Sequence, residues 1–458
     1  MSRSLDRVGL KSGLDATGVS WRELDQVGRE SCAVDGVEPS AICWPETADD
    51  AAKCLQVADR LGASISPRGS GTKIALGNPP RSCDLIVSTE RLRRVVDYAP
   101  ANLTVSVEAG LPLAALQSML SQHDQNLPID PPDADRATLG GVLAANASGA
   151  RRLGHGTGRD LVIGTRSVTA SGLVVRSGGR VVKNVAGYDL GKLYVGSLGT
   201  LVLLVEVNLK VTPIPASQTT TLGRFESLDR VAELSRSIAR SPLMPTALDL
   251  LNAPAAARLT ERLEGLVSRI YSGYLLLALG AAPGGGVRRQ VDEFARLFRQ
   301  AGATDIVQLD LADGHRLWSA VSSLSSLEPE DDRIQIKVSF PPGILLEVWG
   351  ILESHAEDLG GNPSISGRAA SGILYASWPT SGRALNGALA ATASRIGEIR
   401  RKIAVLGGSL VVERCPIVLK KHLDVWGDVG SALPVMKRLK SALDPREIMN
   451  PGRFVGGI

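Results

Sequence analysis

The sequence of 458 residues lacks a long apolar run and lacks paired cysteines. A membrane-spanning helix needs roughly 20 apolar residues, and the apolar run Leu275–Leu279 is far shorter. The five cysteines form no Cys-x-x-Cys pair, their number is odd, and no signal-peptide pattern precedes them. We therefore expect reduced thiols and a cytoplasmic protein, with any contact to the inner face of the cell membrane peripheral and made through partners.

Metal-binding patterns are also missing. The even spacing of Cys32, Cys43 and Cys54 invites a metal interpretation, but no histidine or carboxylate stands at ligand spacing. We expect no metal site and no cysteine-ligated iron–sulfur cluster within this chain. The histidines are scattered, and each is expected to be a surface residue rather than a base or ligand: His123, His155, His315, His355 and His422.

Nucleotide motifs of the common kinds are absent as well. The chain has no Gly-x-Gly-x-x-Gly between a strand and a helix, which argues against an NAD-type Rossmann site. It has no Gly-x-x-x-x-Gly-Lys-Ser/Thr frame, which excludes a Walker A loop. The formal net charge is +4 with no long run of Lys or Arg, so no nucleic-acid partner is indicated.

Glycine, by contrast, is abundant, and it is concentrated in two stretches. One stretch runs from Pro131 to Thr200, and the other is the loop Pro67–Lys73. Glycine permits positive φ and lets backbone approach a ligand closely, and consecutive amides on a tight loop can hold an anion such as a diphosphate. Alternatively, these glycines could belong to the turns of a β domain that binds no ligand.

The length favours two or three domains. Helical signals stand at Trp21–Val27, after Thr47, at Leu139–Asn146 and at Leu433–Leu443, and β ribbons are expected between Val162 and Val211. From Pro213 onward, helices and strands alternate, which is typical of a separate α+β domain. We expect four parts: an N-terminal extension (1–39), a glycine-rich domain (40–213), an α+β domain lying over it (214–430) and a C-terminal segment (431–458).

Several motifs occur in one order along the chain: PRGSGT, ATLGGVLAANASG, RDLVIG, KNVAGYDL, VGSLGTL and DPREIMNPGRF. This order resembles the vanillyl-alcohol-oxidase-type, or PCMH-type, FAD-binding proteins, and in detail it is most similar to the FAD-binding E subunits of bacterial glycolate oxidases (glycolate dehydrogenases). The resemblance covers roughly residues 40 to 213 and the last fifteen residues well, and the middle loosely. It implies an α+β fold in which a two-subdomain PCMH-type FAD-binding domain carries an α+β cap.

The resemblance also implies the FAD site. Pro67–Lys73 would be the pyrophosphate loop, Thr138–Gly149 would follow the pyrophosphate and ribityl chain, and the chain's final segment would return to the isoalloxazine ring. Asp160, Val162 and Ile163 would lie near the adenine and ribose. Gly199, Thr200 and Leu203 would edge the flavin. The remaining expected contacts are Pro67, Arg68, Gly69, Ser70, Gly71, Thr72, Pro132, Thr138, Leu139, Gly140, Gly141, Asn146, Ser148, Gly149 and Asn450.

The sequence departs from the family in two ways. Many relatives attach flavin covalently through a histidine, often in the pyrophosphate loop, where this chain has Ser70 and Thr72; we therefore expect non-covalent FAD. Relatives acting on D-2-hydroxy acids carry histidines in a glycine motif of the cap, where this chain has Arg368 and Tyr375. The sequence identifies no catalytic base. The catalytic candidates are Arg368, Tyr375 and Lys337. Arg368 and Lys337 could equally be solvated surface charges, and Tyr375 could equally be an ordinary strand tyrosine.

Two functional interpretations stay open. In the first, the chain is an FAD-binding subunit that oxidises glycolate, or a similar small D-2-hydroxy acid, to the 2-oxo acid by hydride transfer to flavin. In the second, it is an electron-transfer or assembly subunit, with the substrate chemistry on a partner flavoprotein. The resemblance implies a complex with a second FAD subunit and an iron–sulfur subunit. A stand-alone D-lactate-type dehydrogenase is a third interpretation, and the missing cap histidines argue against it.

Overall fold

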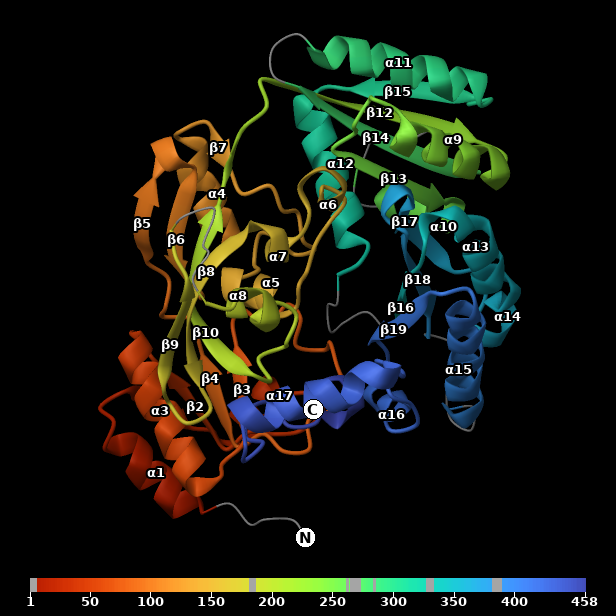
Figure 1. Cartoon of the computed structure of the whole chain (residues 1–458). Coiled ribbons are helices and arrows are strands. Elements are labelled where there is room, and N and C mark those ends of the chain that lie inside the picture. Colours follow the sequence, from red (N-terminus) through yellow and green to blue (C-terminus); the bar gives the residue numbers. More distant parts are fainter. Residues whose placement is uncertain are drawn as a thin grey trace.

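The structure, a computed structural model, describes residues 6–180, 187–260, 263, 273–282, 286–326, 333–380 and 389–458. Its strands form sheets of four, five and eight strands and one two-stranded pair (Figure 1). The four- and five-stranded sheets lie in the first half of the chain, and the eight-stranded sheet lies in the second half. Among the described residues, none of the helices is long and apolar enough to cross a membrane.

The first sheet has the strand order β1-β2-β4-β3 and packs against α3 (Ala48–Leu61). The helix expected after Thr47 is present: the Thr47 hydroxyl caps α3 by accepting the N–H of Asp50 at 3.1 Å, and Gly62 ends the helix at φ 66°. This part contains α1 (Arg7–Asp15), β1 (Ser20–Glu23), α2 (Gln26–Cys32), β2 (Ala41–Trp44), β3 (Ile65–Arg68) and β4 (Leu85–Ser88).

The expected helix over Trp21–Val27 is wrong. Residues 20–23 instead form β1, which pairs antiparallel with β2, and the Asp25 carboxylate caps a helix that begins only at Gln26. A cap within the expected helix divides that stretch into a strand and a helix. Within residues 6–39, β1 is consequently a strand of the first sheet.

The second sheet has the order β5-β6-β10-β8-β9 and carries most of the glycine-rich stretch. The long strands β8 (Val162–Thr169) and β10 (Val202–Lys210) lie where the sequence predicts β structure, and they pair antiparallel next to each other in this sheet. The remaining elements of this part are β5 (Val95–Ala99), η1 (Pro100–Asn102), β6 (Thr104–Glu108), α4 (Leu113–Ser121), β7 (Gln125–Asn126), α5 (Leu139–Ala144), α6 (Arg152–His155), α7 (Gly158–Leu161), β9 (Val174–Gly178), α8 (Leu190–Tyr194) and β11 (Thr212–Pro213).

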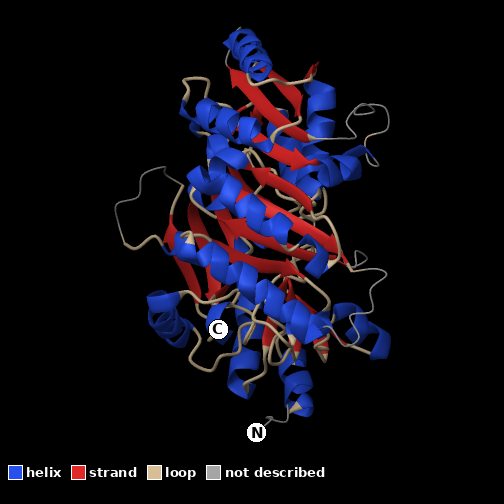
Figure 2. Ribbon diagram, turned by 90° about the vertical axis from the view of Figure 1, so that its right-hand side faces the viewer, coloured by secondary structure: helices blue, strands red, loops and turns tan. Residues whose placement is uncertain are grey.

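The eight-stranded sheet has the order β15-β12-β14-β13-β17-β18-β16-β19, and helices cover it (Figures 1 and 2). Its bounds are β12 (Ser217–Phe225), α9 (Leu228–Arg240), β13 (Ala247–Asn252), α10 (Ala253–Thr260), β14 (Tyr274–Ala282), α11 (Gly286–Gln300), β15 (Asp305–Leu309), α12 (Leu311–Ser323), β16 (Arg333–Ser339), η2 (Pro342–Ile344), α13 (Leu345–Ser354), α14 (Ala356–Leu359), β17 (Ser364–Arg368), η3 (Ala369–Ser371), β18 (Ile373–Pro379), α15 (Leu389–Val405), β19 (Ser409–Arg414) and α16 (Ile417–Lys420).

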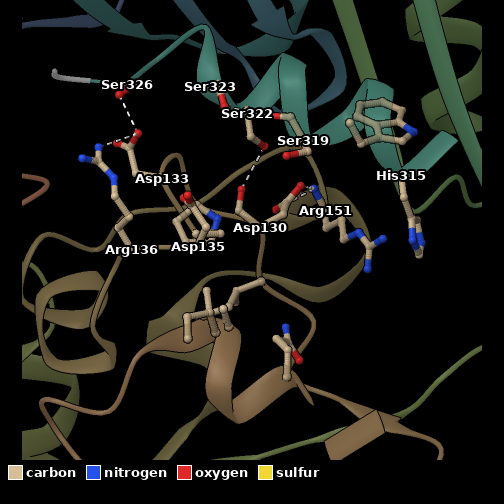
Figure 3. Close-up of a pocket in the computed structure, with 17 residues that line it drawn as sticks. Asp130, Asp133, Asp135, Arg136, Arg151, His315, Ser319, Ser322, Ser323 and Ser326 are labelled. Atoms are coloured by element: carbon tan, nitrogen blue, oxygen red, sulfur yellow. Dashed lines mark hydrogen bonds and ion pairs between the residues drawn. The ribbon is translucent and has the colours of Figure 1, made fainter. Parts of the chain in front are cut away.

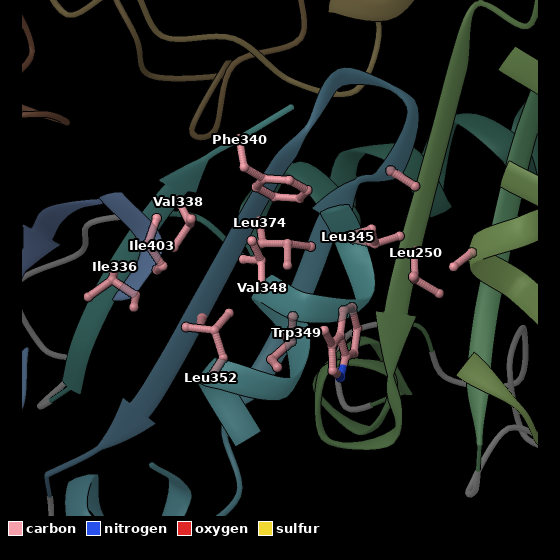
Figure 4. Close-up of a cluster of buried hydrophobic side chains, with 14 of the residues drawn as sticks. Leu250, Ile336, Val338, Phe340, Leu345, Val348, Trp349, Leu352, Leu374 and Ile403 are labelled. Atoms are coloured by element: carbon pink, nitrogen blue, oxygen red, sulfur yellow. The ribbon is translucent and has the colours of Figure 1, made fainter. Parts of the chain in front are cut away.

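Side chains alternate between the two faces of this sheet. On one face, Ile336, Val338 and Leu374 pack with Val348 and Trp349 of α13 in the main hydrophobic core (Figure 4). On the opposite face, the strands on the β12 side pack against α10 and α12. Because strand side chains alternate with a period of two, the residues between the core positions of β16, β18 and β19 must point away from α13. This second face positions the site described below.

The C-terminal segment returns to the first half of the chain. After α17 (Leu433–Leu443), the N–H of Asn450 donates to the carbonyl of Ile65, and the carbonyl of Ile448 accepts from the Ile65 N–H. The buried Lys440 ammonium donates to the carboxylate of Asp444 at 2.6 Å and to the carbonyls of Thr200 and Met449. The last residues, ending in η5 (Val455–Gly457), are thereby fixed beside β3.

A buried ion cluster joins both ends of the chain to the cap region. The Lys420 side chain is 1% exposed; its ammonium donates to both Asp35 oxygens at 2.9 Å, and the Arg453 guanidinium approaches Asp35 at 3.2 Å.

We expect Lys420→Met to lower the free energy of unfolding by ~2 kcal/mol. This loss is smaller than for an isolated buried pair, because Arg453 still faces Asp35. Urea unfolding measures this loss of stability, with Lys421→Met at the exposed neighbouring residue as the control. Equal losses in the two variants would contradict the prediction.

Candidate functional site

Three adjoining cavities run from the second sheet to the eight-stranded sheet. The middle cavity is lined by the loop of residues 67–74, Thr138 and Asn450. It shares Gly69, Gly141 and Leu198 with an inner cavity, and it shares Lys73 and Ala145 with a third cavity that reaches the eight-stranded sheet. We call the third one the cap-end cavity; besides the shared residues it is lined by Pro132, Asn146, Ser148, Ser325, Lys337, Tyr375 and Glu413.

The loop after β3 lines the middle cavity with backbone. A side chain at Gly69 would place its Cβ 2.1 Å from the Thr138 hydroxyl oxygen, so only glycine fits there, and Gly71 has φ 83°. Within the described part of the chain, the N–H groups of Ser70, Gly71 and Thr72 make no hydrogen bond to protein. Free amides on a tight loop form an anion-binding nest.

Helix α5 borders the same cavities with small residues. Thr138 caps the helix by accepting the Gly141 N–H at 3.4 Å. Gly140 is required for packing, because a Cβ there would lie 2.8 Å from that of Ala109, whereas Gly141 lines the cavities. The small residues of α5 therefore serve both close packing and the cavities.

Three buried polar atoms along the cavities lack a hydrogen-bond partner in the described structure: Ser66 Oγ, Asn450 Oδ1 and Asn146 Oδ1. Buried polar atoms are rarely left unsatisfied, so these atoms indicate a polar ligand. A line of adjoining cavities with an anion nest in its middle part, and with unsatisfied polar atoms in the middle and cap-end parts, fits FAD, a long molecule with a central diphosphate. The residues present therefore fit the cofactor that the sequence motifs suggest.

The cap-end cavity gathers charged groups from the second face of the eight-stranded sheet. Lys337 on β16 lies directly opposite Tyr375 on β18 in the strand register, and Glu413 comes from the adjacent strand β19. From the other side, the Lys73 ammonium reaches the carbonyl of Ser325 at 3.5 Å. Burial lowers the pKa of Lys73, an effect that the charge of Glu413 opposes. Two ammonium groups and one carboxylate thus surround this cavity.

Arg368 lies just behind the cavity wall and is buried, not solvated as the sequence suggested. Its guanidinium donates to the carbonyl of Ser148 at 3.1 Å and stacks on the Tyr375 ring, 4.6 Å from the centroid. Asp249 of β13 lies on the same face of the sheet. The pKa of Asp249 is raised to about 7, mainly by burial; the charge of Arg368 opposes this rise and the charge of Asp130 adds to it. Arg368 therefore joins the two halves of the chain at the cavity.

The raised pKa of Asp249 predicts a pH-dependent stability. Between pH 4 and 7 the folded state holds a proton that the unfolded chain releases, so stability falls as the pH rises through this window. We expect Asp249→Asn to be close to wild type at pH 4 and more stable by roughly 4 kcal/mol at pH 8. Denaturant unfolding at both pH values measures this; a difference that is independent of pH would contradict it.

Most of the expected FAD contacts line the three cavities. They are Pro67, Gly69, Ser70, Gly71, Thr72, Pro132, Thr138, Gly140, Gly141, Asn146, Ser148, Gly199, Leu203 and Asn450. Gly199 and Leu203, however, line the inner cavity, which contains no residue of the eight-stranded sheet. Of the KNVAGYDL motif, residues 183–186 lie outside the described residues, so the structure places only its end.

Other expected contacts lie elsewhere. Asp160 caps α7 by accepting the N–H and hydroxyl of Thr157, because a capping box satisfies the start of that helix. Val162 and Leu139 are buried in the hydrophobic core of the second sheet, and Ile163 lies next to Val162 on β8. Thr200 is fully buried and donates its hydroxyl to Ser197. None of these side chains lines the three cavities in the described structure.

Two further expected contacts have structural roles. Gly149 packs against the 129–136 segment, because a Cβ there would lie 1.9 Å from the carbonyl oxygen of Asp130. The Arg68 carbonyl accepts the N–H of Thr89 at 2.8 Å, and the Arg68 guanidinium lies within 3.4 Å of the position of a Cβ on Gly71. Arg68 therefore remains close to the anion nest.

Sequence reasoning missed Glu413 and Lys73 as parts of the site. Lys73 follows the glycine loop directly, and that adjacency was a usable signal. Glu413 alternates with the core positions Leu410 and Val412 of β19, a period that would have placed it on the face of Lys337. One histidine was also misjudged: His355 is buried and contacts the Asp358 carboxylate at 3.3 Å and the Lys402 ammonium at 3.1 Å.

Family models match both halves of this architecture. The FAD binding domain model matches residues 39–178, and the model of the C-terminal domain of FAD-linked oxidases matches residues 214–454, more than half of the chain. The chain belongs to the FAD-linked oxidases. FAD is therefore its cofactor, and the chain is an FAD-linked oxidoreductase.

Individual relatives agree with the family. Glycolate oxidase subunit GlcD of Bacillus subtilis is 27% identical over 91% of this chain and 89% of its own length, and D-2-hydroxyglutarate dehydrogenase of Xanthomonas citri is 23% identical over 94% and 92%. Glycolate oxidase subunit GlcE of Escherichia coli is 38% identical, over 37% of this chain and 48% of its own length. The structure of p-cresol methylhydroxylase superposes with a TM-score of 0.76 at 12% identity, over 98% and 97% of the two chains, which confirms the PCMH-type fold.

Proposed function

We propose that this FAD-linked oxidase oxidises glycolate, or a similar small D-2-hydroxy acid, to the 2-oxo acid in the cap-end cavity. The observation that carries the proposal is the set of Lys73, Lys337 and Glu413 around one cavity at the end of the FAD site. Relatives named for glycolate and 2-hydroxyglutarate support the substrate class. FAD, when bound, accepts the hydride from C2; this chain must hold the carboxylate and take the hydroxyl proton.

The substrate carboxylate is assigned to the two ammonium groups. Lys337 and Lys73 approach the cavity from different parts of the chain, so a carboxylate between them is held from both sides. Tyr375 lines the same cavity and offers a phenolic donor, fixed in place by the stacked Arg368 guanidinium. Arg368 acts as a positioning residue for Tyr375 and for the Ser148 backbone.

The hydroxyl proton is assigned to Glu413. The amide of Gln335, itself fully buried, donates to Glu413 Oε2 at 3.4 Å and to the carbonyl of Ser325 at 3.3 Å, so the carboxylate is held at the cavity wall. A positioned carboxylate within reach of the substrate hydroxyl can act as general base. In this assignment, the O–H proton goes to Glu413 while the C2–H pair leaves as hydride, and the carbonyl bond forms.

The assignment of the two cofactor ends follows from the same chemistry. The reacting ring must meet the titratable groups, so we place it at the cap-end cavity and the adenine half at the inner cavity beside Gly199 and Leu203. Gly199 and Leu203 would then contact the adenine half instead of the flavin ring that the resemblance implied. The domain division at 213 and 430 is retained as part of the proposal, supported by the change of sheet after β11.

We propose further that the chain is an E-type subunit of a glycolate-oxidising complex with a second FAD subunit and an iron–sulfur subunit. The 38% identity to GlcE over 169 residues and the KNVAGYDL and VGSLGTL motifs support this. Association with a membrane would then be peripheral, at its inner face, through these partners. The second candidate function is electron transfer or assembly without substrate chemistry, favoured by Arg368 and Tyr375 standing in place of the histidines of catalytic relatives.

One experiment separates these functions. Glycolate or D-lactate is added anaerobically to the purified FAD-loaded chain, and the visible absorption of the flavin is followed. Bleaching in the isolated chain is the expected result. Bleaching only after reconstitution with partner subunits would show that a partner subunit oxidises the substrate. Bleaching by D-lactate but not by glycolate would favour the D-lactate-type dehydrogenase.

The flavin is expected to be bound non-covalently. No histidine lines the three described cavities, and the loop carries Ser70 and Thr72 where relatives often attach flavin. Acid precipitation should therefore release all of the yellow chromophore into the supernatant. Flavin fluorescence that stays on the denatured chain in a gel would contradict this expectation.

A further inference from the structure

A separate cavity of about 540 Å³ lies at the junction of the two halves of the chain (Figure 3). The segment of residues 129–136 and the end of α12 divide it from the cap-end cavity: Pro132 and Ser325 line the cap-end cavity, and Asp133 and Ser326 line this one. The Ser326 hydroxyl donates to Asp133 Oδ1 at 2.7 Å, and this hydrogen bond joins the two segments that separate the cavities. We call it the junction cavity. The FAD-linked activity proposed above does not use it.

Arg151 brings an available positive charge to the junction cavity. Its backbone N–H contacts both oxygens of Asp130 at 3.2 Å, while in the described structure its guanidinium makes no hydrogen bond or ion pair with protein. The guanidinium extends toward His315 of α12 (Figure 3). Burial, and next the charge of Arg151, lower the pKa of His315, which leaves a neutral imidazole beside the guanidinium at neutral pH. An unpaired guanidinium favours a carboxylate or phosphate group.

Acceptors for hydroxyl groups line the same cavity. Asp133 has a side chain only 7% exposed, and its Oδ2 has no hydrogen-bond partner among the described residues. Ser319, Ser322 and Ser323 present hydroxyls from one face of α12 (Figure 3). An unsatisfied buried carboxylate oxygen requires a donor, and a hydroxyl of a ligand supplies one without adding a second charge.

We propose that the junction cavity binds a polyhydroxylated anion, such as a sugar acid or a sugar phosphate. The anionic group would lie on Arg151 beside His315, and hydroxyls would donate to Asp133 Oδ2 and exchange hydrogen bonds with the serine face of α12. The volume suits a ligand several times larger than a two-carbon acid. The proposal stands independently of the substrate assigned to the cap-end cavity.

Isothermal titration calorimetry of the FAD-loaded chain tests this proposal. D-Gluconate and glucose 6-phosphate serve as the carboxylate and phosphate probes, glucose as the neutral polyol, and acetate and inorganic phosphate as anions without hydroxyls. At least one polyol anion is expected to bind at least tenfold more tightly than glucose and the simple anion of its own charged group. Arg151→Gln should weaken that binding at least tenfold, with Arg159→Gln, at an exposed arginine outside the cavity, as matched control.

A second variant tests whether the loss of binding in Arg151→Gln comes from the cavity itself and not from an indirect structural effect. Ser319 lies on an exposed part of α12, so Ser319→Phe fills the cavity without changing a charge. It should abolish binding of the polyol anion while the flavin spectrum and FAD content stay at wild-type values. Absence of binding of both polyol anions to the wild type, equal binding of glucose, or retention of binding in both variants would overturn the proposal.

Discussion

Glu413→Gln is expected to slow the reduction of bound flavin by glycolate about a thousandfold. Glutamine keeps the shape and the contact with Gln335 but cannot accept the substrate proton, and general base catalysis is worth roughly 10²–10⁴ in rate. FAD content should be unchanged, because Glu413 lies beyond the anion nest of the pyrophosphate loop. Anaerobic stopped-flow absorbance at the flavin band measures the rate.

The matched control for this variant is Glu398→Gln on α15. Glu398 makes exposed ion pairs with Arg395 and Lys402, which contribute little to stability. Its flavin reduction rate should equal that of the wild type. A Glu413→Gln rate within a few-fold of wild type would remove Glu413 from the role of base, whereas loss of FAD in this variant would show that Glu413 shapes the cofactor site instead.

Gly71→Asp is expected to empty the FAD site. The new carboxylate would lie in the nest of free N–H groups and within reach of Arg68, so that the nest repels a diphosphate and Arg68 pairs with the aspartate. Affinity should fall by more than about tenfold, enough for purified protein to lose its yellow colour. The ratio of flavin to protein absorbance measures the retained FAD.

Gly18→Asp is the control for backbone strain. Gly18 has φ 71°, close to the φ of 83° at Gly71, and no atom lies within 4 Å of the position of its Cβ. The same substitution therefore introduces similar strain and the same charge on an exposed surface away from the cavities. Full FAD content in Gly18→Asp together with loss in Gly71→Asp locates the effect in the nest; full content in both would remove Pro67–Lys73 from the pyrophosphate role.

Local signals explain what could be predicted from the sequence. Thr47 and Thr138 were identifiable as helix caps, because a hydroxyl side chain preceding an apolar periodic segment satisfies free N–H groups. The loop at Gly69 and Gly71 was recognisable because only glycine tolerates its contacts and its φ. The stretch after Trp21 was misjudged, since a pairing with β2, twenty residues onward, outweighed its helical pattern.

Tertiary neighbours explain what could not be predicted. The sequence alone suggests that Arg368 is a surface charge. Its burial is explained only by its hydrogen bond to the Ser148 carbonyl and its stacking on the Tyr375 ring. Likewise, Glu413 and Lys73 are separated by 340 positions, and no local pattern shows that they share a cavity. Thr200 sits in a glycine motif, yet its role is to support the buried ammonium of Lys440, a contact made by the returning C-terminal segment.

The position of FAD in this chain is the most direct test of the account. A crystal structure of the FAD-loaded chain should show the diphosphate on the N–H groups of Ser70, Gly71 and Thr72. It should also show the isoalloxazine ring in the cap-end cavity between Asn146 and Tyr375. A ring bound beside Gly199 and Leu203, away from Lys337 and Glu413, would contradict the account.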